Sequence, residues 1–349
     1  MKAVILEKPG KFVVKEIDTP EIGDNEVLIK IYASGICTND VRDFKGECNY
    51  SYPRIGGHEY CGTIVSMGKE VNKNHFAIGQ KAVQYIIDDC KECCFCKSKQ
   101  ENICENLPLT KTFQNPGGLS GYCGFAEYIN AKAEDVVVFP DDADFADMVF
   151  TEPLACAVNS VNHTNIKFGD DVLVIGGGTM GLLHVMLAKL KGARVILSEP
   201  MAERRKKALK LGCDYAFDSI NDDIVSRVKE LTGGHGANVV FNTTAIPAIA
   251  KQAVELTIPG GTAVMFSSIH PNKPVEVDMG AVHSFQKTIT GAVSPTIDAY
   301  YQAVLLISKK IINPAELIED IIPYKDFGKA IALASQSDTY KVILKFGEF

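Results

Sequence analysis

The middle of the chain alternates between short apolar runs and longer segments whose apolar residues recur at helical spacing. Residues 172–175 form a continuous apolar run, bounded by charge on one side and glycines on the other, as is typical of a buried parallel strand. From Met180 to Leu190, apolar residues recur every three or four positions, and Gly192 stands where such a helix would end. A second apolar run covers residues 195–197. The pattern predicts a strand–helix–strand unit, the repeating element of a doubly wound parallel α/β sheet.

The same alternation continues after this unit and predicts a complete Rossmann-type domain. In order, we expect a helix over 200–212, a strand at 215–217, a helix that starts after Asp222 and Asp223, a strand at 239–241, a helix over 247–256, strands at 262–266 and 288–293, and a returning helix over 299–308. Pro200 suits the first turn of its helix, and the two aspartates favour the positive end of the next helix dipole.

The N-terminal third has a different pattern, with short β-rich runs separated by proline and glycine. The predicted strands cover residues 1–7, 12–17, 26–33, 62–65, 81–87, 126–129 and 135–138. Short strands at irregular spacing predict a small β-rich domain of the kind that forms a barrel. The first seven residues contain too few apolar side chains for a signal peptide.

Length and composition limit the classes of protein to which the chain can belong. At 349 residues it is expected to form two domains, and 46% hydrophobic with 23% charged residues is ordinary for a globular protein. The net charge of −7 argues against nucleic acid as a partner, and no apolar run is long enough to cross a membrane. Eleven cysteines without an export signal indicate metal ligands and free thiols, so we expect a cytoplasmic protein.

The glycines that follow residues 172–175 match the dinucleotide-binding pattern G-x-G-x-x-G. Gly176 permits a sharp turn, and Gly178 allows the backbone to approach a pyrophosphate at the helix N-terminus. Gly181 allows close packing of the helix against the strand. A glycine-rich turn that binds nothing is the alternative, and the strand–turn–helix context disfavours it.

An acidic residue also stands where a dinucleotide site needs one. Glu199 follows the glycines by about 20 residues, where a carboxylate binds the ribose hydroxyls and repels a 2′-phosphate, which favours NAD over NADP. Arg204 and Arg205 weaken that preference. The residues expected to contact the cofactor are Gly176, Gly178, Thr179, Met180, Gly181, Glu199, Arg204 and Thr243.

Four cysteines in one short segment have the spacing of a structural zinc site. Cys90, Cys93, Cys96 and Cys104 give the pattern C-x2-C-x2-C-x7-C, and four thiolates close a tetrahedral site with no open position. Cys94 is not expected to be a ligand, because the flanking cysteines already supply four. An iron–sulfur site and a redox-active cysteine patch are alternatives, although the last interval does not match the ferredoxin spacing. The acidic balance disfavours a nucleic-acid-binding zinc ribbon.

A second set of metal-binding residue types is spread along the chain. Cys37, His58, Glu59 and Glu152 offer one thiolate, one imidazole and one or two carboxylates, a combination found in catalytic zinc sites that keep a position open for water or substrate. Taken one at a time, they also suit a buried thiol, a hydrogen-bonded core histidine and an acid at the start of a helix.

Together these motifs resemble those of the zinc-containing medium-chain dehydrogenases, in the branch of sorbitol (polyol) and threonine dehydrogenases. The resemblance covers essentially the whole chain. It rests on residues 35–40 (Gly-Ile-Cys-Thr-Asn-Asp), 57–59 (Gly-His-Glu), the four-cysteine lobe, 121–128, 152–154 (Glu-Pro-Leu) and 176–181. It implies a GroES-like catalytic domain over residues 1–155 with a zinc lobe at about 88–106, a Rossmann NAD-binding domain over 156–292, and a return of residues 293–349 to the catalytic domain.

The resemblance also implies two zinc sites. Cys37 and His58 correspond to ligands of a catalytic zinc, Glu59 to a direct or water-mediated ligand, and Glu152 to a residue beside the metal. Asp40 corresponds to the acid that hydrogen-bonds the ligating histidine and fixes its orientation. The family's structural zinc corresponds to the lobe of Cys90, Cys93, Cys96 and Cys104.

The chain departs from the family pattern around the expected substrate site. Asn39 stands where the family usually has a serine or threonine hydroxyl that relays the substrate proton. Arg42 and Asp43 replace the His-Tyr pair of polyol dehydrogenases, and residues 291–295 lack the arginine usual in the returning segment. Simple sorbitol specificity is therefore in doubt. One hypothesis is that Arg42 binds a carboxylate or phosphate of the substrate, and the alternative is a solvated surface arginine.

The sequence therefore predicts a zinc-dependent oxidoreductase that transfers a hydride between NAD and a secondary alcohol of a polyol or sugar-derived small molecule. The alternatives are a threonine or amino-alcohol dehydrogenase, an aldonate dehydrogenase and, in a different class, a non-catalytic nucleotide-binding redox sensor. A zinc-free quinone reductase is disfavoured because both sets of metal ligands are intact. The resemblance further implies a homodimer or homotetramer, because exposed strand edges of Rossmann domains in this family commonly pair between subunits.

Overall fold

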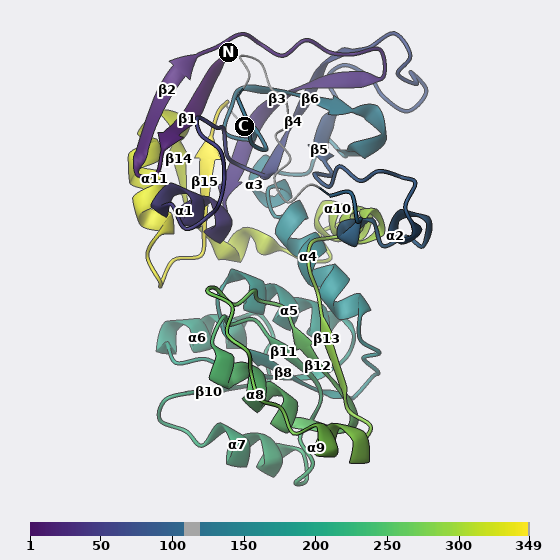
Figure 1. Ribbon diagram of the computed structural model, residues 1–349, viewed down its shortest axis with the longest axis vertical. Helices are drawn as coiled ribbons and strands as arrows, with labels where there is room; N and C mark the ends of the chain where they lie inside the picture. Colours follow the sequence, from purple (N-terminus) through teal and green to yellow (C-terminus); the bar gives the residue numbers. More distant parts are fainter. Residues whose placement is uncertain (108–118, 348–349) are drawn as a thin grey trace. The chain divides into compact units, whose positions relative to one another are not determined.

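A computed structural model describes residues 1–107 and 119–347 of the chain (Figure 1). The chain divides into two compact units, each with its own core. The first consists of Met1–Pro153 together with Thr296–Phe349, and the second of Leu154–Pro295. The first unit is therefore built from both ends of the chain.

The first unit is β-rich. A two-stranded sheet pairs β1 with β2, and a seven-stranded sheet has the order β14-β15-β3-β4-β5-β7, with β6 also paired to β3. Its strands are β1 (Lys2–Lys8), β2 (Lys11–Glu16), β3 (Glu26–Ile36), β4 (Glu59–Met67), β5 (Lys81–Gln84), β6 (Tyr128–Lys132), β7 (Val136–Phe139), β14 (Ile318–Pro323) and β15 (Lys341–Lys345). Figure 1 shows the C-terminal strand β15, in yellow, beside β3, in purple, and the two pair in antiparallel register.

Short helices connect the strands of this unit. They are α1 (Thr38–Lys45), α2 (Cys94–Lys97), α3 (Phe145–Met148), α10 (Ile297–Ser308) and α11 (Phe327–Ala334), while α4 (Thr151–Asn162) leads from the first unit into the second. The core of the sheet contains Ile29, Ile31 and Ile64, all fully buried. Glu101 of the cysteine lobe accepts a 2.6 Å hydrogen bond from the backbone N–H of Ile297, which fastens the lobe to the start of α10.

The second unit is a six-stranded, wholly parallel sheet with the order β10-β9-β8-β11-β12-β13, which is the 3-2-1-4-5-6 order of a Rossmann domain. Its strands are β8 (Asp171–Ile175), β9 (Arg194–Ser198), β10 (Tyr215–Phe217), β11 (Ala237–Asn242), β12 (Thr257–Met265) and β13 (Thr288–Gly291). Its helices are α5 (Thr179–Leu190), α6 (Ala202–Lys210), α7 (Ile224–Leu231), α8 (Pro247–Glu255) and α9 (Met279–Ser284). The strand order reverses between β8 and β11, the crevice where such sheets bind nucleotides.

The predicted fold class is confirmed, with an α/β Rossmann sheet and a β-rich GroES-like unit. Several element bounds differ from the predictions. The strand expected over 81–87 ends at Gln84, the one expected over 126–129 lies at Tyr128–Lys132, and β3 continues to Ile36. The sequence pattern did not reveal α1, because this eight-residue helix is polar and is held by its N-terminal cap, where Asp40 bonds the backbone N–H of Cys37.

Candidate metal and cofactor sites

The four lobe cysteines lie within reach of one metal ion. Their sulfur atoms are mutually within 4.8 Å, and individual pairs are separated by 3.4 Å (Cys93 to Cys96), 3.5 Å (Cys104 to Cys90), 3.8 Å (Cys93 to Cys104) and 3.9 Å (Cys90 to Cys96). A tetrahedron with Zn–S bonds of about 2.3 Å has edges of about 3.8 Å. The sulfur cage therefore has the size of a zinc site, and none of these cysteines forms a disulfide.

Polar groups around Cys90 favour its thiolate over its thiol. The Asn106 side chain and the backbone N–H groups of Glu92 and Cys93 lower the pKa of Cys90 to about 6. These N–H groups lie 3.5 and 3.3 Å from the Cys90 sulfur. Cys94 lies outside the sulfur group and is exposed.

A second group of candidate ligands forms where two neighbouring strands meet. Cys37 follows the end of β3 and is the N-terminal cap of α1, and His58 and Glu59 stand at the start of β4. The antiparallel register of β3 and β4 places Gly35 opposite Glu59. As a result, one sulfur, one imidazole nitrogen and one carboxylate oxygen lie within 4.8 Å of one another.

The surroundings of this group suit a bound cation. His58 is 9% exposed, and its Nδ1 has no hydrogen-bond partner among the described residues. Burial alone would lower the pKa of His58, but the negative charges of Cys37 and Asp40 raise it well above its ordinary value. A metal ion would pair with the free nitrogen of this buried imidazole and would offset the negative charge of the neighbouring cysteine and two acids.

Asp40 bonds backbone groups on both sides of the candidate metal ligands. Its Oδ2 accepts from the N–H of Cys37 at 2.9 Å, and its Oδ1 accepts from the N–H of Gly57 at 3.0 Å. The Nδ1 of His58 lies 3.9 Å from Asp40 Oδ2, which is an ion-pair distance and too long for a hydrogen bond. In this structure Asp40 therefore fixes the backbone that carries Cys37 and His58 rather than the imidazole directly.

Lys341, which the sequence analysis did not identify, lies directly against Glu59. Its ammonium group donates a hydrogen bond to the Glu59 carboxylate, and both side chains are buried. Burial alone would lower the pKa of Lys341, but the charges of Glu59 and Cys37 outweigh it, so the pKa is raised and the lysine stays charged. A Cβ at Gly35 would meet both side chains, so the glycine leaves the room they need.

Glu152 lies near this group without belonging to it. It is in the first turn of α4 and is 9% exposed, and its charge helps to raise the pKa of His58 and of Lys341. It is not among the side chains whose ligand atoms lie within 4.8 Å of one another. Tyr122 packs beside the metal-ligand group, with its ring centroid 5.4 Å from that of His58.

The region around Asn39 contains further polar contacts that the sequence did not indicate. The amide nitrogen of Asn39 lies 3.4 Å from the hydroxyl oxygen of Tyr50, and Cys48 Sγ lies 3.8 Å from the amide oxygen. The guanidinium of Arg54 stacks 3.8 Å above the centre of the Tyr50 ring. Arg42 lies 3.7 Å from the exposed Glu47, an ion pair that solvent screens and that a charged ligand can readily replace.

The predicted dinucleotide loop has the backbone geometry that its glycines require. Gly176 has φ +100°, and a Cβ at Gly181 would lie 1.9 Å from the carbonyl oxygen of Gly176. Gly178 is the N-terminal cap of α5, so the backbone N–H groups of Thr179 and Met180 lie in the first turn of that helix. This is the arrangement that binds a pyrophosphate in dinucleotide sites.

Glu199 stands beside this loop, at the end of β9. Its Oε2 accepts a 2.6 Å hydrogen bond from the N–H of Gly177, and its Oε1 accepts from Met201 at 2.9 Å. The carboxylate is thus fixed next to the glycine turn. Arg204 lies nearby, because a Cβ at Gly178 would be 3.6 Å from one of its terminal nitrogens.

Two other predicted residues have structural contacts. The Thr243 hydroxyl donates to the carbonyl oxygen of Ile175 at 2.8 Å and lies beside the glycine turn, so it braces the turn from the neighbouring strand β11. Arg205 forms an ion pair with Asp218 at 3.1 Å and donates to the carbonyl oxygens of Glu199 and Pro200. Its charge is therefore already used within the unit.

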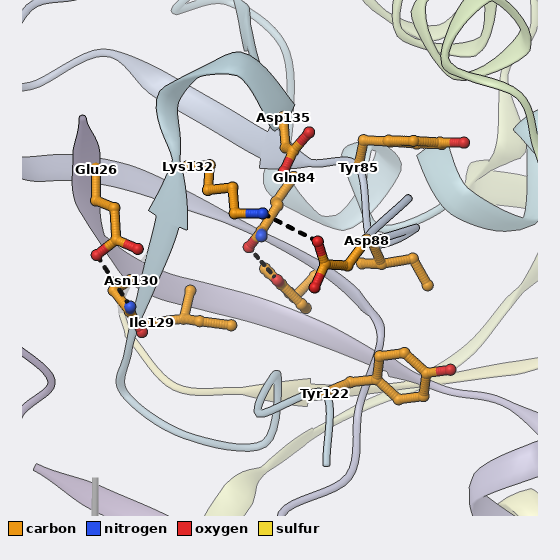
Figure 2. A pocket seen from close by; sticks show the side chains of 11 residues that line it. Glu26, Gln84, Tyr85, Asp88, Tyr122, Ile129, Asn130, Lys132 and Asp135 are labelled. Atoms are coloured by element: carbon orange, nitrogen blue, oxygen red, sulfur yellow. Dashed lines mark hydrogen bonds and ion pairs between the residues drawn. The ribbon is translucent and has the colours of Figure 1, made fainter. Parts of the chain in front are cut away.

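A separate small cavity of about 110 Å³ lies in the β-rich unit (Figure 2). Its polar lining is largely paired internally, as Figure 2 shows, since Lys132 contacts Asp88 at 2.9 Å and Asn130 contacts Glu26 at 3.2 Å. Tyr122 borders this cavity, but none of the candidate ligands Cys37, His58 and Glu59 does.

Comparison with known proteins identifies the class. The model of the alcohol dehydrogenase GroES-like domain matches residues 23–141, and that of the zinc-binding dehydrogenases matches residues 179–309. The chain belongs to the zinc-containing medium-chain alcohol dehydrogenase family. The part of the chain that the structure describes has no helix of the length and apolar character needed to cross a membrane.

Relatives of similar length have several different activities. The chain is 29% identical to the D-arabitol-phosphate dehydrogenase of Enterococcus avium (99% of this chain, 97% of the relative) and 29% identical to the sorbitol dehydrogenase of Halalkalibacterium halodurans (99% of each). It is 32% identical to the L-threonine 3-dehydrogenase of Pyrococcus furiosus (98% of each).

Solved structures show the same fold with different nucleotides. A putative zinc-binding dehydrogenase of Sinorhizobium meliloti bound to NADP has a TM-score of 0.90 at 29% identity, over 99% of each chain. An alcohol dehydrogenase of Escherichia coli CFT073 in complex with NADH has a TM-score of 0.88 at 26% identity, over 99% of each chain.

Proposed function

We propose that this oxidoreductase oxidises a secondary alcohol of a polyol or sugar-derived substrate, with NAD as hydride acceptor and one catalytic zinc ion. The observation that carries the proposal is the group of Cys37, His58 and Glu59, whose three ligand atoms lie within 4.8 Å. Three protein ligands to a tetrahedral ion leave one position for a substrate oxygen.

Two zinc ions per chain are part of this proposal. Cys37 and His58 would hold the catalytic ion, with Glu59 as a further ligand that Lys341 also engages. Cys90, Cys93, Cys96 and Cys104 would hold a structural ion. When bound, the catalytic ion supplies Lewis-acid polarisation of the substrate hydroxyl and NAD supplies the hydride acceptor.

The protein's part in the chemistry is to position groups and to set the charge around them. Asp40 holds the backbone of Cys37 and Gly57, which keeps the thiolate and the imidazole converged. Glu152 adds negative charge beside them. The first turn of α5 would bind the pyrophosphate through Thr179 and Met180.

The preference for NAD rests on Glu199. Its carboxylate is fixed by the N–H groups of Gly177 and Met201 beside the dinucleotide loop, where it would accept from the ribose hydroxyls and repel a 2′-phosphate. Arg204 near Gly178 opposes that repulsion in part. Arg205, committed to Asp218, does not.

The substrate is proposed to be hydroxylated, and an anionic group on it is favoured by one observation. Arg42 is a partly exposed cation near Cys48 and Asn39, and its contact to Glu47 is long at 3.7 Å. Two relatives are named D-arabitol-phosphate dehydrogenase and L-galactonate-5-dehydrogenase. The substrate in the first name has a phosphate group, and the substrate in the second has a carboxylate. A sugar phosphate or an aldonate is therefore the second candidate class, and threonine is the third.

The quaternary structure proposed for the protein is a homodimer or homotetramer. Strand β13 is an edge of the Rossmann sheet, and Ile289 on it and Val293 just beyond it are exposed. An apolar sheet edge is a surface on which a second strand can pair. Light scattering of the purified protein would measure the number of subunits, and a monomer at all concentrations would contradict the proposal.

The test of the function is NAD⁺ reduction across polyols, aldonates, sugar phosphates, threonine and simple alcohols, with and without a chelator. Turnover that a chelator abolishes and zinc restores is the expected result. Arg42→Ala should raise KM for acidic substrates only. No turnover on any substrate by protein that holds two zinc ions and binds NADH would contradict the proposal and favour a non-catalytic nucleotide-binding sensor.

A further inference from the structure

The proposed reaction needs a route by which the substrate hydroxyl loses its proton. The side chain at position 39, two residues after Cys37 in the first turn of α1, is an amide and has no proton that it can exchange at ordinary pH. A side chain that relays the proton would therefore have to be another one. Tyr50 is the hydroxyl that the structure places against this amide.

The hydrogen bond between Asn39 and Tyr50 leaves the Tyr50 hydroxyl able to relay a proton. Asn39 Nδ2 is the donor and the Tyr50 oxygen the acceptor, at 3.4 Å. A phenol oxygen has two acceptor sites and one proton, so one acceptor site and the O–H remain available. Among residues 1–107 and 119–347 no group accepts a hydrogen bond from the Tyr50 O–H, and the side chain is half-buried, within reach of water.

A buried ion pair holds the Tyr50 ring in place. The Arg54 guanidinium lies 3.8 Å from the ring centre, and Arg54 Nε is 3.3 Å from the carboxylate of Asp43. Both charged side chains are less than 10% exposed. Tyr52 donates to the same carboxylate at 2.7 Å. Desolvated cation–π stacking of this kind fixes the plane and position of an aromatic ring.

Tyr50 is also connected to the candidate metal ligands, because Asn39, which donates to its hydroxyl, stands two residues after Cys37 in the first turn of α1. The Tyr122 side chain is within electrostatic range of His58, Glu152 and Tyr50. Tyr122 in turn packs 5.4 Å from His58, centre to centre. Through Asn39 and Tyr122, Tyr50 therefore belongs to the surroundings of the group formed by Cys37 and His58.

We propose, on the basis of the function proposed above, that Tyr50 is the proton-relay residue that replaces the hydroxyl missing at Asn39. As the substrate is oxidised, its O–H bond breaks and the proton bonds to the free acceptor site of the Tyr50 oxygen. The phenol proton passes to solvent water, and the hydride leaves the adjacent carbon for NAD⁺. The products are a ketone, NADH and one proton in water.

The experiment compares five proteins: wild type, Tyr50→Phe, Asn39→Ser, the Tyr50→Phe/Asn39→Ser double variant, and Tyr52→Phe as the matched control. The last removes a phenol hydroxyl from the same ion-pair cluster without touching Asn39. Zinc content is measured for each. Proton release is followed with a pH dye when trifluoroethanol, which does not transfer hydride, is mixed with enzyme and NAD⁺, and kcat and KM are measured on the best alcohol.

We expect Tyr50→Phe to keep two zinc ions and its KM but to slow proton release and kcat by about 100-fold, the size of a proton-transfer contribution. The double variant should recover to within about 10-fold of wild type, because serine at position 39 restores a hydroxyl. Tyr52→Phe should stay within about threefold of wild type.

Three outcomes would overturn the inference: proton release by Tyr50→Phe at the wild-type rate, a slowing of Tyr52→Phe as large as that of Tyr50→Phe, or a double variant that remains as slow as Tyr50→Phe alone. Each would show that the tyrosine is dispensable or merely structural. Wild-type protein that is loaded with zinc and oxidises no alcohol would instead overturn the proposed function, and the relay with it.

Discussion

Lys341 donates a hydrogen bond to the carboxylate of Glu59, although 282 residues separate the two in the sequence. Both side chains are buried, and the pair links the first residue of β15 to the first residue of β4, on either side of β3. A carboxylate that is a candidate metal ligand is therefore already bonded to a cation of the protein. A zinc ion held by Cys37 and His58 would therefore share Glu59 with Lys341.

Lys341→Met should destabilise the zinc-stripped protein by about 3–5 kcal/mol, because it leaves Glu59 as a buried charge without a partner. The zinc-loaded protein should lose less stability, because the metal then compensates the charge of Glu59. Urea denaturation with and without zinc measures both values. Lys341→Arg, which keeps the charge, is the control, and an equal loss in both metal states would refute the argument.

The cysteine lobe gives a prediction with a matched control in the same segment. Cys104→Ser should lower the zinc content from two ions to one per chain and unfold the lobe, since a structural zinc contributes directly to folding. Because Glu101 of the lobe bonds Ile297, the start of α10 should also lose protection from hydrogen exchange. Cys94→Ser should change neither quantity, because Cys94 is exposed and outside the sulfur group. Two zinc ions in Cys104→Ser protein would contradict this assignment.

The sequence revealed the parts of the protein whose causes are local. The apolar runs at β8 and β9, the glycines at Gly176 and Gly181 and the spacing of the lobe cysteines each operate within a few dozen residues, and the structure has the predicted elements there. Local patterns say little, however, about which distant strands pair.

Lys341 shows that limit. Lys341 precedes an apolar run, and a lysine in that position is usually solvated at the start of a strand. Only the pairing of β15 with β3 brings it to Glu59. The one signal in the sequence was Gly35, a glycine inside a strand, which often marks close approach of another group. Tyr50 was missed for a different reason: it lies outside the helices and strands, so no periodic pattern predicts its contacts with Asn39 and Arg54.

Glu199 offers a test of cofactor choice. Glu199→Gln keeps an acceptor oxygen for one backbone N–H but removes the charge that would repel a 2′-phosphate. We expect the ratio of kcat/KM for NAD to that for NADP to fall by about 100-fold, which corresponds to about 2.7 kcal/mol. Glu203→Gln, on the neighbouring exposed turn of α6, is the control for loss of one negative charge. If the NAD to NADP ratio of kcat/KM changes equally in both variants, Glu199 does not discriminate between the two cofactors at the ribose.

His184 should make the stability of the Rossmann unit depend on pH. Its Nδ1 lies 2.7 Å from the Met180 carbonyl oxygen and must carry a proton to bond it, so Nε2 accepts from Ser160 at 2.9 Å and the ring is neutral. Burial lowers the pKa of His184 to about 4, whereas in the unfolded chain it is about 6.5. The unfolded state therefore binds the extra proton first as pH falls, and stability is lost between about pH 6.5 and 4.

Between pH 7 and pH 5 this linkage removes about 2 kcal/mol from the free energy of unfolding. His184→Gln, which cannot titrate, should be less stable than wild type at pH 7 because its packing against Phe241 and Phe266 is poorer, but it should lose about 2 kcal/mol less on acidification. Urea denaturation at the two pH values measures the difference. His235→Gln, in an exposed turn, should keep the wild-type dependence. An unchanged pH dependence in His184→Gln would mean that the buried imidazole is protonated as readily in the folded protein as in the unfolded chain.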